Sequence, residues 1–144
     1  MYRPDFADTL TYSTLRRRLA ALVYDSLAAI GIIFIASLLI LPFSEGEALD
    51  QSSVGYQLYR LYLLLLMLFY FAWSWSRGQT LGMRSWRLYL VTDEIKRVSF
   101  ARAAARFIIA LLLPIIGYTS LIWRADKKTI PDLILGTNVL YKPK

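Results

Sequence analysis

The residue that most requires an explanation is Asp25, the one charged residue in an apolar run that extends from residue 19 to residue 41. A carboxylate at the centre of a bilayer costs about 2.5–3.5 kcal/mol, and less nearer the interface, so the surrounding leucines and isoleucines can offset it. A carboxylate that faces lipid is still unfavourable, and we therefore expect Asp25 to have a partner inside the protein. Such an acid could carry a proton or a monovalent cation, or it could hold helices together.

Arg18 lies seven residues before Asp25. Seven residues of α-helix turn through about 700°, so the two side chains share one face, about 10 Å apart along the axis and too far for a direct ion pair. We expect Asp132 to supply the anion beside Arg18. Either Arg102 or Arg106 would supply the cation beside Asp25. Small residues near the same stripe would let another helix approach, namely Ala21, Ala28 and Ala36.

The composition excludes several classes of chemistry. The 144 residues include neither Cys nor His, which removes thiol and Ser–His catalysis, disulfides, lipidated cysteines and most metal sites. The pair Tyr24–Asp25 is similar to one in intramembrane aspartyl proteases, but that chemistry needs a second carboxylate that shares the proton. No Gly-x-Gly-Asp sequence is present to supply it. We expect a protein that is not an enzyme and that has no catalytic residues, metal or cofactor.

The hydrophobic content is high, at 57% of the residues, and a water-soluble domain of this length would then expose a large apolar surface. Two runs are long enough to cross a hydrocarbon layer of about 30 Å. They are residues 19–41, which end before Pro42, and residues 56–76, which have aromatic residues at both ends. A cleaved signal peptide explains the first run less well, because the run is long and begins after 18 residues.

Positive charge predicts the orientation of these spans. Arginines precede the first span, the loop 42–55 has acidic but no basic residues, and the segment 77–106 is rich in arginine. Because basic loops stay in the cytoplasm, we expect the N-terminus and segment 77–106 inside and loop 42–55 outside. The basic residues would also attract anionic lipids of the inner leaflet, and no nucleic-acid partner is expected.

A third apolar run, residues 107–123, is interrupted by Pro114 and Gly117. Its length of about 25 Å is the short limit for a span. A full crossing would place the basic residues of the tail outside, against the charge rule. A broken, re-entrant pair of half-helices would return them to the cytoplasm. The sequence favours the re-entrant segment, with a Pro-kinked third span as the alternative.

The polar segments predict a small cytoplasmic cap. Residues 86–91 alternate as a strand does, and residues 97–100 could return the chain as a hairpin. Ser99 could cap a helix that begins at Phe100. The whole chain, residues 1–144, is then a single all-α integral membrane domain. It has two full transmembrane helices, a third broken apolar segment and a cap made of a β-hairpin and short helices.

The C-terminal part of the cap has its own local signals. Thr129 could cap a short helical turn that has Pro131 at its first position and Gly136 at its end. Asp132 falls in that first turn, where the helix dipole favours an anion. Residues 137–141 could form a last strand. Before the cap, Gly78, Thr80 and Gly82 lie in a tight loop that lacks the Lys-Ser/Thr ending of a phosphate-binding loop.

The order of these motifs resembles that of the RDD family of small bacterial membrane proteins, over roughly residues 12–141. The family's Arg…Asp signature is similar to Arg18…Asp25, and its Gly-x-Thr-x-Gly loop is similar to residues 78–82. Its final block resembles Arg102…Arg106 followed by the broken apolar run and residues 131–139. The residues behind the family's name then correspond to Arg18, Asp25 and Asp132.

The resemblance implies a bacterial inner-membrane protein that is sometimes suggested to act in transport. The sequence departs from the family pattern at two places. Met83 follows the glycine loop, where members often carry Lys, and Ile130-Pro131 precede the last Asp, where a His is common. A role that depends on that Lys or His is therefore in doubt here. Two or three spans cannot enclose a pathway alone, so transport of an ion or small solute would need a homo-oligomer or a larger membrane complex. The alternative is a structural or accessory membrane module whose Arg/Asp network locks the helix packing.

Overall fold

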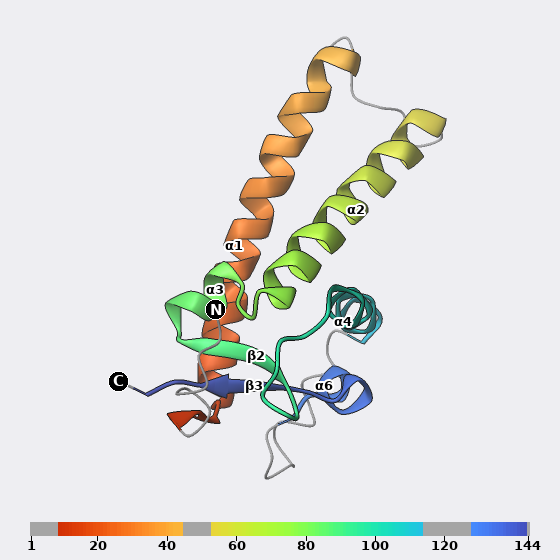
Figure 1. Ribbon diagram of the computed structural model, residues 1–144. Coiled ribbons are helices and arrows are strands. Elements are labelled where there is room, and N and C mark those ends of the chain that lie inside the picture. Colours follow the sequence, from red (N-terminus) through yellow and green to blue (C-terminus); the bar gives the residue numbers. More distant parts are fainter. Residues whose placement is uncertain (1–8, 45–52, 114–127, 144) are drawn as a thin grey trace.

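Two long helices extend from a small cap in the computed structural model, which describes residues 9–44, 53–113 and 128–143 (Figure 1). Helix α1 spans Leu15–Ile40 and continues into the 3-10 helix η2, Leu41–Ser44. Helix α2 spans Val54–Ser76. It begins where the Ser53 hydroxyl accepts a hydrogen bond from the Tyr56 N–H at 3.1 Å. Both helices lie where the apolar runs predict them, and α1 begins before residue 19, so that it includes Arg18.

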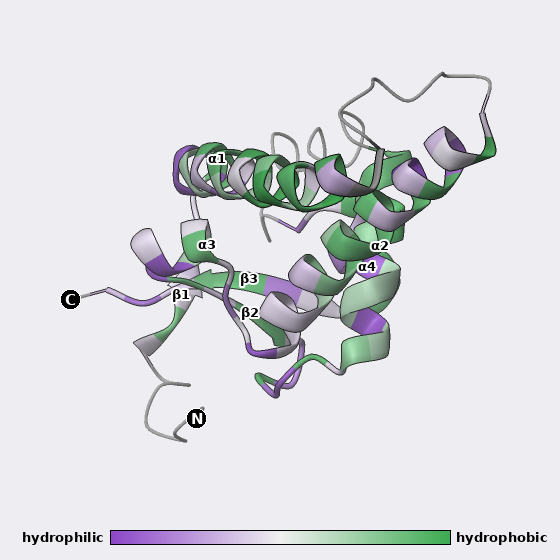
Figure 2. Ribbon diagram, turned by 90° about the horizontal axis from the view of Figure 1, so that it is seen from above, coloured by the Kyte–Doolittle hydropathy of each residue, from purple (hydrophilic) through white to green (hydrophobic). Residues whose placement is uncertain are grey.

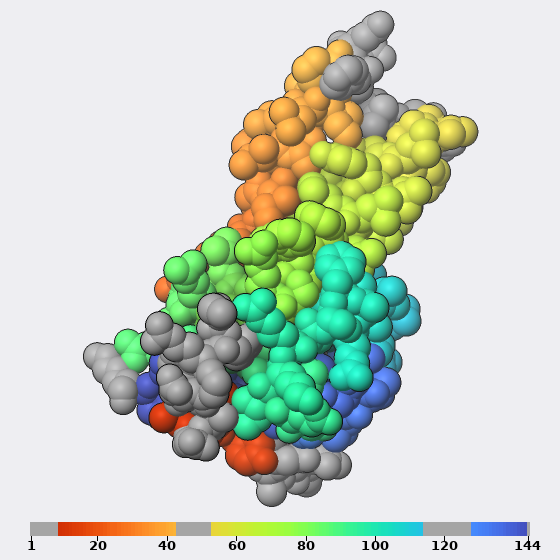
Figure 3. Space-filling model, in the orientation of Figure 1, coloured from red at the N-terminus to blue at the C-terminus, as the bar shows by residue number. Residues whose placement is uncertain are grey.

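Hydrophobic residues predominate along the two long helices (Figure 2). Both are long and apolar enough to cross a membrane. The space-filling view shows them as a narrow arm above the wider cap (Figure 3). Large apolar side chains on this arm are well exposed, among them Leu27, Phe34, Leu58 and Leu65. The arm therefore presents to its surroundings the kind of surface that a folded domain normally buries.

The cap is a three-stranded antiparallel sheet flanked by short helices. Strand β3 (Thr137–Tyr141) lies in the centre, between β1 (Thr11–Tyr12) and β2 (Leu88–Thr92). Leu90 pairs with Val139, and Tyr12 pairs with Leu140. Helices α3 (Leu81–Ser85), α4 (Phe100–Leu112) and α6 (Ile130–Leu135) complete it. The sheet thus joins three segments that are far apart in the sequence.

The predicted hairpin is wrong in its second strand. Strand β2 forms, but its partner is β3 rather than residues 97–100. Ser99 instead caps α4, its hydroxyl accepting from the Arg102 N–H at 3.4 Å. A helix N-cap and a strand compete for the same residues, and here the cap and the helix after it prevail. The predicted last strand is β3, and its pairing replaces the hairpin.

The core of the cap lies where the sheet meets the first turns of α1, the last turns of α2 and one face of α4. Small residues allow the helices to approach closely, since Ala21, Ala72 and Ala103 are almost completely buried. Leu88 and Leu90 project from β2 into the same cluster. The cap is therefore packed against the ends of the long helices rather than attached by a linker.

The last part of the third apolar run lies outside the described residues. Residues 107–112 belong to α4, whereas residues 114–123 are not among those that the structure describes. The choice between a re-entrant segment and a kinked span thus stays a prediction for them. Helix α6 begins at Ile130, so Pro131 occupies its second position instead of the predicted first. Gly136 ends α6 in the left-handed region with φ 60°, as its position predicts.

Candidate functional site: a buried charge network between helices and cap

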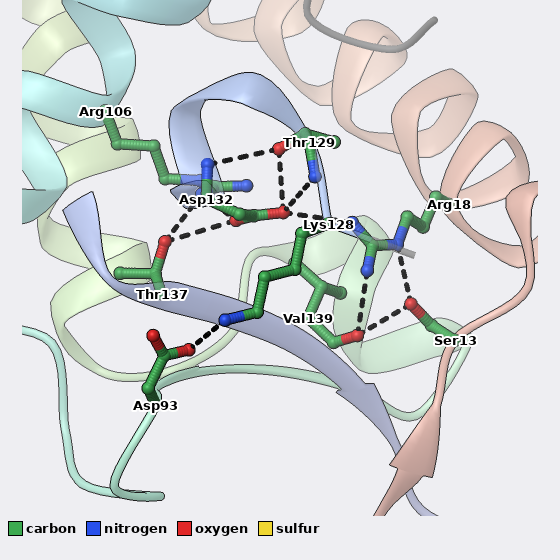
Figure 4. Close-up of polar contacts among 9 residues, drawn as sticks. All are labelled: Ser13, Arg18, Asp93, Arg106, Lys128, Thr129, Asp132, Thr137 and Val139. Carbon is green, nitrogen blue, oxygen red and sulfur yellow. Dashed lines mark hydrogen bonds and ion pairs between the residues drawn. The ribbon is translucent and has the colours of Figure 1, made fainter. Parts of the chain in front are cut away.

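Asp132 is the centre of the network and is fully buried (Figure 4). Helix α6 holds it through a capping box, in which the Thr129 N–H donates to Asp132 Oδ2 at 3.0 Å and the Thr129 hydroxyl accepts from the Asp132 N–H at 3.4 Å. The same hydroxyl also lies 2.7 Å from Asp132 Oδ2 and donates to it. The Thr137 hydroxyl donates to Asp132 Oδ1 at 3.1 Å. Neutral groups at the start of α6 and on β3 thus already hold the carboxylate in position, independently of the two arginines.

Arg18 brings the N-terminal end of α1 to this carboxylate. Its Nη1 donates to Asp132 Oδ2 at 3.1 Å, and its Nη2 donates to the Val139 carbonyl at 3.1 Å. Its Nε donates to the Ser13 hydroxyl at 2.6 Å, and that hydroxyl donates to the same Val139 carbonyl at 2.7 Å. The predicted pairing of Arg18 with Asp132 is present, and it joins α1 to α6 and β3.

Arg106 binds the other side of the carboxylate. Its Nη1 donates to Asp132 Oδ1 and also to the Thr137 hydroxyl, the latter at 3.0 Å. Its guanidinium lies 5.3 Å from the ring centroid of Trp75, at the end of α2. Asp132 therefore receives one guanidinium from α1 and one from α4, and the two cations are separated by a single anion.

The environment of Asp132 favours its charged form. Burial alone would raise the pKa of this carboxyl, but Arg106, Arg18 and the donors of Thr129 together hold the pKa below its ordinary value. A buried charge pair of this kind is strongly destabilising to break, because removing one partner leaves the other uncompensated.

This lowered pKa predicts an acid sensitivity. A carboxyl whose pKa is lower in the folded state stabilises the fold above its unfolded pKa, and the contribution is lost as pH falls through the folded pKa. We expect the thermal midpoint of the wild type to decrease when the pH drops below about 4, because Asp132 then becomes protonated. The part of that fall due to Asp132 should be missing in Asp132→Asn, measured over the same pH range in detergent. An identical acid profile for the two proteins would contradict the assignment.

Asp25 has different partners from those predicted. The Thr80 hydroxyl donates to its Oδ2 at 2.5 Å, and the Gly82 N–H donates to its Oδ1 at 2.8 Å. The prediction that Arg102 or Arg106 lies beside it is wrong, since Arg106 binds Asp132 and Arg102 is exposed. The physical reason is the start of α3, where the Gly82 N–H has no partner within its own helix and can bind an anion on α1.

The glycine loop is shaped to meet Asp25. Gly78 has a φ of 95° and its carbonyl accepts from the Leu90 N–H at 2.7 Å, which ties the loop to β2. Thr80 caps α3 and accepts from the Met83 N–H at 3.2 Å. A Cβ added at Gly82 would lie 2.1 Å from the Ala21 carbonyl oxygen. The second glycine is therefore required by the close approach of α3 to α1.

A small cavity lies beside Asp25 and the two arginines that bind Asp132. Its volume is about 80 Å³, and its lining includes Asp25, Arg18 and Arg106 together with the apolar Trp75 and Met83. The volume suits one or two water-sized species. Among the described ranges, no three acidic side chains gather in a way that could hold a metal ion.

Sequence reasoning found the charged members of the network but missed the contacts of most of its neutral members. Ser13 and Thr137 carry no local signal, because each acts across the sheet on residues distant in sequence. The prediction of Thr129 as the cap of this helix is confirmed. Thr80 and Gly82 were marked as a loop, without the contact to α1 that gives them their role.

Comparison with known proteins agrees with the motif order. A family model described as the RDD family matches residues 12–136. Searches of the curated proteins and of the solved structures returned no match. The matched range includes Arg18, Asp25 and Asp132 and most of the chain. The chain therefore belongs to the RDD family, and it is a membrane-associated protein.

Proposed function

We propose that this chain is a non-catalytic module of the bacterial inner membrane, in which buried charges hold two transmembrane helices on a cytoplasmic cap. The observation that carries this proposal is that both buried carboxylates at the junction of helices and cap accept hydrogen bonds from groups of the fold itself. Asp132 accepts from donors on α1, α4, α6 and β3, and Asp25 accepts two hydrogen bonds from the loop and helix beside α1. Such pairing stabilises a helix arrangement and leaves little of either carboxylate for chemistry.

The pairing of the sheet strands supports a position of three segments on the same side of the membrane. Strands β1, β2 and β3 pair with one another, so residues 11–12, 88–92 and 137–141 lie on the same side of the membrane. Two crossings by α1 and α2 satisfy this requirement. The chain between β2 and β3 must also cross an even number of times or not at all, which supports the re-entrant alternative over a single third span. The basic residues of the N-terminus and of segment 77–106 favour the cytoplasm for this side.

This topology is testable because the chain contains no Cys. Single cysteines at Thr11, Lys142 and Val54 would each report the side of the membrane on which that residue lies. Val54 is at the end of α2 that is far from the cap. In intact spheroplasts, an impermeant thiol reagent should label Val54→Cys and spare Thr11→Cys and Lys142→Cys until the membrane is opened. Labelling of Lys142→Cys with protection of Thr11→Cys would mean that the two strands lie on opposite sides, and it would refute the proposal.

The cavity supports a second candidate function, movement of a proton, cation or small solute through an oligomer. Asp25 lines the cavity together with Arg18 and Arg106, and acids in such positions occur in transporters. The exposed apolar side chains of α1 and α2 leave surface for lipid, for other copies or for a host complex.

Two matched variants separate the candidates. Asp25→Asn removes the charge, whereas Thr80→Val removes a neutral hydroxyl that binds the same carboxylate. For the module, reconstituted wild-type protein should show no proton or cation flux, and both variants should lower the thermal midpoint by several degrees. Flux in the wild type that is abolished by Asp25→Asn and retained in Thr80→Val would favour the conduit instead.

A further inference from the structure

We propose that helix α4 lies flat in the cytoplasmic interface of the bilayer and embeds one apolar face among the lipid acyl chains. This inference rests on the proposed insertion of α1 and α2. It assigns a lipid-binding surface to α4, whose residues 107–112 are the start of the predicted third apolar run.

Helix α4 has two distinct faces. The face toward the protein buries Ala103 and carries Arg106 inward to Asp132. The opposite face is apolar and exposed, with exposed fractions of 46% for Phe100, 51% for Ile108, 56% for Leu111 and 72% for Leu112. A helix with this division, whose apolar face the described residues leave uncovered, is typical of helices that lie in a membrane interface.

The direction of α4 agrees with such a position. Figure 1 views α4 nearly along its axis, whereas α1 and α2 run across the same view, and Figure 2 shows α4 from the side. Helix α4 therefore runs across the long helices. When α1 and α2 cross the bilayer, α4 is directed along the membrane plane.

Aromatic contacts set the depth of α4. The Phe100 ring lies 6.3 Å from that of Phe69, and the Phe107 ring lies 5.6 Å from that of Phe71, measured between centroids. These partners belong to the end of α2 that also carries Tyr70, Trp73 and Trp75, where polar-edged aromatic rings mark the membrane boundary. Helix α4 thus lies at the level of the aromatic belt.

The apolar face of α4 continues the exposed surface of α2. Phe69 and Phe100 are both about half exposed and lie against one another. Lipid that covers Phe69 on α2 therefore meets Phe100 without a polar break. Arg102 is exposed on α4 away from this apolar face, where it can reach anionic headgroups.

Spin labels on single cysteines test this arrangement in vesicles that contain anionic lipid. We would label Ile108 and Leu111 on the apolar face, Arg102 as the matched position on the other side, and Leu65 on α2 as the reference within the bilayer. Collision with oxygen and with a water-soluble nickel complex gives the depth of each label. The labels at 108 and 111 should show similar shallow depths, with 102 in contact with water and 65 several ångströms deeper.

Three other results would overturn the inference. Labels at 108 and 111 that collide freely with the nickel complex would place the face in water. Labels that sink steadily from 102 through 108 to 111, toward the depth of 65, would make α4 the start of a span. Spin–spin broadening at 108 and 111 that vanishes on dilution with unlabelled protein would identify a second copy as the occupant. A label at 65 that is open to water would refute the proposed insertion as well.

Discussion

Replacing Asp132 with alanine is expected to destabilise the protein by about 3–5 kcal/mol, the usual cost of breaking a buried ion pair. The effect is large because Arg18 and Arg106 would lose their shared anion while they remain buried. Denaturant-induced unfolding in detergent, followed by the fluorescence of Trp75 and the other tryptophans, would measure the loss.

Asp93→Ala is the matched control for this change. Asp93 also pairs with a cation, Lys128 at 2.5 Å, but its side chain is half exposed. An ion pair of this kind contributes about 0–1 kcal/mol. Equal losses in Asp132→Ala and Asp93→Ala would show that the buried network carries no special share of the stability.

Substituting Gly82 with alanine is expected to cost at least about 3 kcal/mol, at or above the upper end for overpacking in a dense interior. The added Cβ would meet the backbone of α1, at 2.1 Å from the Ala21 carbonyl oxygen and 2.9 Å from the Asp25 carboxyl carbon. A backbone atom cannot rotate away as a flexible side chain can. Helix α3 would have to move, and the hydrogen bond from the Gly82 N–H to Asp25 would be lost.

Gly31→Ala gives the corresponding control within α1. A Cβ at Gly31 has no atom within 4 Å, and alanine favours a helix over glycine by about 0.8–1 kcal/mol. Its thermal midpoint should be unchanged or raised, whereas that of Gly82→Ala should fall by several degrees or the protein should fail to accumulate. A Gly82→Ala protein as stable as Gly31→Ala would contradict the close contact between α3 and α1.

Local rules predicted the elements whose signals are contained in a few neighbouring residues. The positions of α1 and α2 follow from two long apolar runs, and the starts of α4 and α6 follow from Ser99 and Thr129 as caps. The partner of β2 could not be found in this way. Its pairing with β3 depends on chain segments that are far apart, and the nearer residues 97–100 offered a plausible strand of their own.

The same distinction applies to the charged residues. Arg18 and Asp132 were paired correctly because each buried charge needs an opposite one, and the chain offers few acids. Asp25 was assigned a cation on the same reasoning, which overlooked neutral donors. Two hydrogen bonds from a hydroxyl and a helix N-terminus satisfy its carboxylate at 2.5 and 2.8 Å. Only the fold shows that the glycine loop reaches α1 at this position.

A double-mutant cycle on Arg18 and Asp132 tests most directly the claim that buried charge fixes the long helices to the cap. The free energy of unfolding would be measured for the wild type, Arg18→Gln, Asp132→Asn and the double variant under one set of detergent conditions. The structure predicts a coupling energy of about 2 kcal/mol or more, within the range for residues in direct contact in one network. Losses that add to within about 0.5 kcal/mol, as for independent sites, would contradict it.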